Sequence, residues 1–152
     1  MNLMQLLQDR GDDILREAYQ MMARARLKNY EAAGVQQIQQ RLQALYELVT
    51  RSVAEKNLVP MRMYAKAIAT ERFESGFDLW EVQTAFNVLE ETIWRCILNE
   101  MQPEEYAEAL GLVSTVLGTG KDTLARTYVT LASKTKTPFF NVQHLFNGTE
   151  GL

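Results

Sequence analysis

Apolar residues recur every three or four positions through most of the chain, and this spacing puts side chains on one face of an α-helix. No segment alternates between apolar and polar residues in the way that a half-buried strand does. Glycine, proline and helix-capping residues divide the periodic pattern into five parts. The pattern therefore predicts an all-α protein, arranged as an up-and-down bundle of about five helices.

The first two predicted helices cover residues 2–28 and 35–55. Gly11 and Asp12 mark a candidate break in the first, because glycine weakens a helix and aspartate is a good N-cap. The second has an apolar stripe as narrow as the seam of a coiled coil, formed by Val35, Ile38, Leu42, Leu45 and Val49.

Start signals also mark the next two predicted helices. Pro60 suits a first helical turn, since its missing N–H would be unpaired there, and this helix extends to about residue 75. Asp78 and Glu81 have the spacing of a capping box, in which each side chain binds the other residue's backbone N–H. The helix that follows has the clearest core stripe in the chain: Leu79, Val82, Phe86, Leu89, Ile93 and Ile97.

Pro103 opens the fifth predicted helix, which extends to about residue 134. Gly118 and Gly120 interrupt its middle, and we interpret them as points of close helix approach or of a kink. Gly118-Thr-Gly-Lys121 looks like the end of a phosphate-binding loop. Neither the residue types around it nor its helical setting fit that motif, which follows a strand.

The pattern stops after the fifth helix, so we expect a single helical domain at residues 1–134 and a tail at residues 135–152. The tail is too aromatic for a typical disordered segment. We expect it to dock on its own bundle or on a partner through Phe139, Phe140, Leu145 and Phe146. Thr135 and Thr137 lie in this region, but no motif identifies them as phosphorylation sites.

Composition is that of one globular domain. The chain has 152 residues, 47% of them hydrophobic and 23% charged, with a net charge of −3. The negative charge and scattered basic residues argue against a nucleic-acid partner. No apolar run reaches the roughly 18 residues of a membrane span. With a single cysteine, Cys96, the chain forms no internal disulfide, and we expect a cytoplasmic location.

Residues suited to catalysis or metal binding are few. His144 is the single histidine and lies in the tail, where no helical di-iron or haem site could use it. Cys96 lies beside Ile93 and Ile97, so core packing is its expected role. We therefore expect no catalytic activity, no cofactor and no metal site.

Two charged residues border the apolar faces of their helices. Arg72 follows Ile68 by four positions, and Glu90 precedes Ile93 by three. If the two helices are antiparallel neighbours, these side chains could form a structural ion pair, because a half-buried charge needs a partner. A role for the pair in anchoring a ligand is a second hypothesis.

Arg72, Gly76 and the segment from Leu79 to Trp94 form a recognisable series: an arginine that ends one helix, a glycine turn, and an amphipathic helix with a late tryptophan. This series resembles the N-terminal domain of RsbR and RsbRD-type co-antagonists of the RsbT kinase, from the bacterial stressosome. The resemblance implies a helical, commonly dimeric sensor or scaffolding input without established enzymatic activity. It also offers haem-free globin-like packing as an alternative to the bundle.

In that family a C-terminal STAS domain, which the kinase phosphorylates, normally follows the input domain. We expect this chain to act as an input domain standing alone, without a STAS domain. The leading hypothesis is a regulatory or sensory module that dimerises and binds proteins, with kinase or STAS signalling proteins as candidate partners. The alternative is an accessory or scaffolding subunit of a larger cytoplasmic assembly.

Self-association is a further expectation. The first predicted helix has more apolar residues than one stripe needs, which leaves material for a homodimer interface. These residues are Met1, Leu3, Met4, Leu6, Leu7, Met21 and Met22. The alternative, that they complete the core of the monomer, is equally open at this point.

Overall fold

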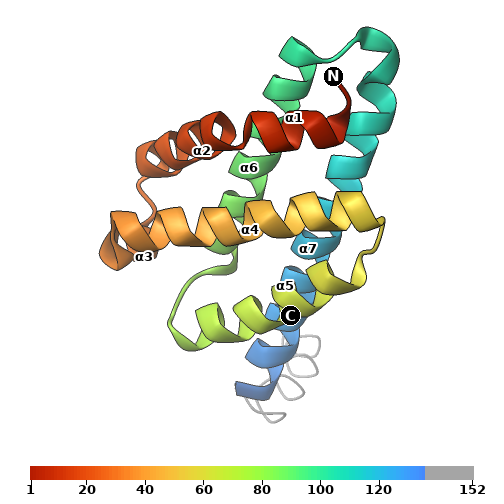
Figure 1. Ribbon diagram of the computed structural model, residues 1–152. Coiled ribbons are helices and arrows are strands. Elements are labelled where there is room, and N and C mark those ends of the chain that lie inside the picture. Colours follow the sequence, from red (N-terminus) through yellow and green to blue (C-terminus); the bar gives the residue numbers. More distant parts are fainter. Residues whose placement is uncertain (136–152) are drawn as a thin grey trace, which may run out of the picture.

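The structure is a computed structural model that describes residues 1–135 (Figure 1). Within these residues all regular elements are helices, so the all-α prediction is confirmed. The elements are α1 (Leu3–Asp9), α2 (Gly11–Ala25), α3 (Lys28–Ala33), α4 (Val35–Glu55), α5 (Val59–Glu74), α6 (Leu79–Glu100), a 3₁₀ turn η1 (Pro103–Glu105) and α7 (Tyr106–Thr135).

The first predicted helix, residues 2–28, is divided into α1 and α2, and a further short helix follows it. A break is present next to Gly11, where Arg10 has φ −106° and ψ 8° and separates α1 from α2. Arg26 then takes the left-handed conformation, with φ 51°, and ends α2. The short helix α3 follows, which periodicity missed because six residues are too few to show it.

The other boundaries are close to those predicted. Helix α4 has the predicted bounds, and Pro60 lies in the first turn of α5. The capping box of Asp78 and Glu81 is present at the start of α6. Pro103 opens the 3₁₀ turn η1, and α7 begins three residues later.

The helices form two crossed pairs with α5 added at one end (Figure 1). Helices α2 and α4 are joined through the short α3 and pack against each other, and they cross the pair α6–α7 steeply. Helix α7 packs along both α5 and α6. The predicted up-and-down bundle, with near-parallel helix axes, therefore does not describe the whole arrangement. The short helix α3 joins α2 to α4, and these two helices cross the α6–α7 pair.

Helices α5, α6 and α7 meet at Gly120. A Cβ atom at this position would lie 2.6 Å from Phe86 Cε2 and 2.9 Å from Met61 Sδ. Close helix approach is thus confirmed as the reason for Gly120. The same explanation is wrong for Gly118, around which a Cβ would find open space.

Most of the surplus apolar residues at the N-terminus lie in the core of the monomer. Leu3, Leu6, Leu7 and Met22 are buried, and Met4 and Met21 pack half-buried against the same core. Met1, by contrast, is 42% exposed. These residues therefore contribute little exposed apolar surface to a homodimer interface.

Candidate functional site

Arg72 is the most deeply buried cation among the described residues. It lies in the last turn of α5, and its side chain is 5% exposed. Its Nη1 donates to the exposed Glu71 carboxylate at 2.6 Å, and its Cζ lies 5.8 Å from the centre of the Phe77 ring. Within residues 1–135 its buried Nε has no hydrogen-bond acceptor.

The expected ion pair between Arg72 and Glu90 is wrong. Glu90 instead accepts a hydrogen bond from Lys121 of α7, with 2.8 Å between Nζ and Oε1, and its side chain is 13% exposed. The pairing assumed that α5 and α6 are direct neighbours. In the structure both helices pack mainly against α7, so the cation that reaches Glu90 comes from α7.

A second arginine, Arg41 of α4, approaches the same aromatic ring. Its Cζ lies 5.2 Å from the centre of the Phe77 ring and 5.6 Å from that of Tyr30. Its Nη2 donates to Gln37, while its buried Nη1 has no acceptor among the described residues. Burial lowers the pKa of Arg41, and the positive charge of Arg72 lowers it further. The two guanidinium groups therefore interact unfavourably.

Arg41 and Arg72 line a small, partly open cavity with a volume of about 20 Å³. We call it the Arg41–Arg72 cavity. Tyr30 and Tyr64 add phenol groups to its wall, and the rest of the wall is apolar: Met22, Ile38, Leu42, Leu45, Ile68, Val82, Ala85 and Phe86. Burial raises the pKa of the Tyr30 phenol, and the charges of Arg72 and Arg41 oppose that rise. The cavity thus combines an apolar wall with polar groups from α3, α4 and α5.

Glu81 holds the α3 side of this cavity in place. Its carboxylate, on a residue that is 1% exposed, accepts from the backbone N–H of Asn29 at 3.0 Å and from the Asn29 amide at 2.6 Å. Asn29 directly precedes Tyr30, so these bonds fix α3 against the start of α6. Burial pushes the pKa of Glu81 up, but the hydrogen bonds from Asn29 and Asp78 outweigh that effect and the pKa is lowered.

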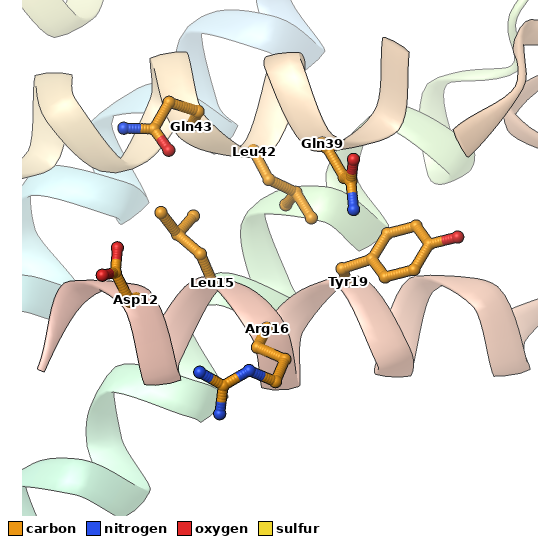
Figure 2. A pocket seen from close by; sticks show the side chains of 7 residues that line it. All are labelled: Asp12, Leu15, Arg16, Tyr19, Gln39, Leu42 and Gln43. Atoms are coloured by element: carbon orange, nitrogen blue, oxygen red, sulfur yellow. The ribbon is translucent and has the colours of Figure 1, made fainter. Parts of the chain in front are cut away.

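A surface groove lies between α2 and α4, and it shares the lining residue Leu42 with the Arg41–Arg72 cavity (Figure 2). Its volume is about 400 Å³. Leu15 of α2 and Leu42 of α4 point into the space between the helices, beside Tyr19. Asp12, Gln39 and Gln43 supply polar groups along its sides. A second hollow of about 420 Å³ continues along α4 and shares Asp12, Leu15 and Gln43 with it.

Several residues considered in the sequence lie outside the described residues: His144, Thr137 and the aromatic tail residues Phe139, Phe140, Leu145 and Phe146. Cys96 packs half-buried against the core, as expected, and burial raises the pKa of its thiol. Within residues 1–135, no group of three or more metal-ligating side chains comes together. No helix of that segment is long and apolar enough to cross a membrane.

The sequence carried a signal for Arg41 that the prediction did not use. Arg41 follows Ile38 by three positions and precedes Leu45 by four, which is the kind of spacing that singled out Arg72. Tyr30 and Asn29 had no comparable signal, because they belong to the short helix α3.

Residues 8–132 match the family model described as the RsbT co-antagonist protein rsbRD N-terminal domain. The match covers most of the 152 residues, and the chain belongs to this family. The resemblance noted around Arg72 and α6 is thereby confirmed. No curated protein and no solved structure matches the chain.

Proposed function

We propose that this chain is a regulatory input module of the stressosome type, which acts in the cytoplasm by binding proteins and not by catalysis. Family membership over residues 8–132 carries this proposal. The family is named for a co-antagonist of a kinase. This name favours a regulatory role through contacts with other proteins. A kinase of the RsbT type or a STAS-domain protein is the partner class that we propose.

The α2–α4 groove is the surface that we assign to a partner protein. It has the composition of a small binding site: two leucines between the helices, an aromatic ring at one end, and polar side chains around them (Figure 2). Among the described residues that line it, Tyr19 is the aromatic one; it is half-buried, and aromatic residues often contribute most to binding.

Direct binding to a purified RsbT-type kinase and to a STAS-domain protein tests this assignment. We expect Tyr19→Ala combined with Gln43→Arg to weaken binding at least tenfold, because it removes an aromatic contact and adds a charge. Gln40→Arg is the matched control, since Gln40 is exposed on α4 but does not line the groove. Equal affinity of the groove variant and the control would remove the groove from the proposal. Binding to neither protein would contradict the proposed function and favour an accessory role in another assembly.

Pairing with a second copy is the other part of the proposal, and α6 offers a surface for it. Trp94 and Leu98 lie one helical turn apart and are 39% and 50% exposed. Sedimentation at micromolar concentrations should show a dimer that Leu98→Glu weakens. Val129→Glu, which changes an exposed apolar residue near the C-terminal end of α7, should leave the dimer intact. A monomer across this concentration range would exclude the dimer.

A further inference from the structure

The Arg41–Arg72 cavity collects two positive charges that come from different helices. Both arginines line it, one from α4 and one from α5. Each has a buried N–H without an acceptor in residues 1–135: Nε of Arg72 and Nη1 of Arg41. The Arg72 side chain is 5% exposed, so water at the surface solvates its charge poorly. Buried charges are normally paired, and these two are paired incompletely.

The nearby carboxylates do not neutralise this charge from inside the cavity. Glu71 binds Arg72 Nη1 from the outside, where its own side chain is 62% exposed. Glu81 is buried, but it accepts its hydrogen bonds from Asn29 and Asp78. Neither glutamate lines the cavity. Among residues 1–135, the wall therefore contains two arginines and no carboxylate to balance their charge.

The size of the cavity limits what could supply that negative charge. A volume of about 20 Å³ is enough for one species of about the size of water, since roughly 10–15 Å³ is the minimum. We propose that the Arg41–Arg72 cavity binds one compact monovalent anion of about the size of chloride. Such an anion would accept from both arginines, with the phenols of Tyr30 and Tyr64 as further donors. Formate, sulfate and larger anions do not fit the volume.

Anion binding would connect three segments of the fold. Arg41 belongs to α4, Arg72 to α5 and Tyr30 to α3, so a bound anion would hold these helices together at one point. Occupancy would thus stabilise the folded chain by mass action. This inference rests on the cavity and not on the proposed protein-binding function, and either can fail without the other.

Thermal unfolding of the full chain at constant ionic strength tests the proposal. Sodium gluconate, whose anion is too large for the cavity, is replaced stepwise by sodium chloride, sodium formate or sodium sulfate. We expect chloride to raise the Tm along a saturating curve, and formate and sulfate to leave it unchanged because they are too large. At ten times the Kd, the unfolding equilibrium constant should fall about elevenfold. A Tm that does not depend on the anion, or formate or sulfate as effective as chloride, would overturn the proposal.

Variants of the two arginines separate specific binding from a general salt effect. Arg41→Gln and Arg72→Gln each remove one cavity cation, and we expect the saturating response to disappear in both. Arg126→Gln is the control, because its side chain is 80% exposed on α7 and does not line the cavity. If Arg72→Gln does not fold, Arg41→Gln decides, since Arg41 is less buried. An unchanged anion response in Arg41→Gln would contradict the proposed site.

Discussion

Glu81 and Asn29 are 52 positions apart in the sequence, and their side chains are joined by a hydrogen bond of 2.6 Å. The same carboxylate also accepts from the backbone N–H of Asn29 at 3.0 Å and from that of Asp78 at 3.1 Å. The Glu81 carboxylate therefore accepts from backbone N–H groups at the start of two helices, α3 and α6. Backbone N–H groups at a helix start have no acceptor within their own helix, so one buried side chain supplies an acceptor to both helices.

Replacement of Glu81 by glutamine should destabilise the fold. Glutamine keeps the shape but loses the charge, and its NH₂ group would face donors of Asn29. We expect a loss of about 1.5–3 kcal/mol in the free energy of unfolding, the range for hydrogen bonds to charged groups. Denaturant unfolding measures it. Glu104→Gln, at an exposed position, should change stability by less than about 0.5 kcal/mol.

The lowered pKa of Glu81 also predicts a dependence on acid. When the folded-state pKa lies below the unfolded value, the unfolded chain binds the proton first as the pH falls. The contribution of Glu81 is thus fully present above the unfolded pKa and is lost as the pH falls through the folded one. Between pH 6 and pH 3 the wild-type chain should lose more stability than Glu81→Gln. Parallel curves for the two proteins would contradict this role.

Gly120 and Gly118 form a matched pair for a packing test. Gly120→Ala places a Cβ within 2.6 Å of Phe86 and should cost about 1–3 kcal/mol, the range for overpacking. Gly118→Ala meets open space on the same helix, and it should stabilise the chain by up to about 1 kcal/mol through helix propensity. Tm values of the two variants check this. A similar change of the same sign in both would show that α5, α6 and α7 are not tightly packed at Gly120.

Local patterns predicted the helices well, and contacts between helices less well. The apolar stripe predicted the bounds of α4, and the spacing of Asp78 and Glu81 predicted the cap of α6. These signals are local, because helix periodicity and capping involve residues a few positions apart. The cavity depends on Arg41, Arg72 and Tyr30 meeting from three helices. Which helices become neighbours is set by the crossing of the two pairs, and periodicity does not determine that.

The error over Glu90 has the same origin. Its position beside the core stripe correctly indicated a half-buried charge that needs a partner. Spacing alone could not show that α7, and not α5, supplies the cation. The sequence pattern around Lys121 indicated only an incomplete phosphate-loop motif, and it carried no signal for the ion pair with Glu90.

The ion pair between Lys121 and Glu90 should matter more than the exposed pairs of the molecule. Its side chains are 27% and 13% exposed, while those of Arg126 and Asp122 are 80% and 61% exposed. Lys121→Met would leave the Glu90 charge without its main partner, and we expect a cost of about 1–3 kcal/mol. Arg126→Met should cost less than about 0.5 kcal/mol. A double-mutant cycle with Glu90→Gln measures the coupling, and a value near zero would show that the pair contributes nothing.

The raised pKa of Tyr128 predicts that the folded chain loses stability in alkali. Its hydroxyl donates to the Phe77 carbonyl at 2.9 Å, and burial raises its pKa from 10.0 to about 12. The unfolded phenol ionises first as the pH rises, so the contribution of Tyr128 is complete below pH 10 and is lost as the pH approaches 12. The free energy of unfolding should therefore fall steeply above pH 10.

Tyr128→Phe separates the two effects of this residue. At pH 7 the variant loses the hydrogen bond to Phe77 and should be less stable by about 1 kcal/mol. Between pH 9 and pH 11 it should lose less stability than the wild-type chain, because one group that ionises first in the unfolded state is gone. Tyr106→Phe is the matched control: its hydroxyl also donates to a carbonyl at 2.9 Å, that of Leu98, but this hydrogen bond is exposed and Tyr106 is only half-buried. Equal alkaline slopes for Tyr128→Phe and the wild-type chain would show that Tyr128 does not titrate differently in the folded state.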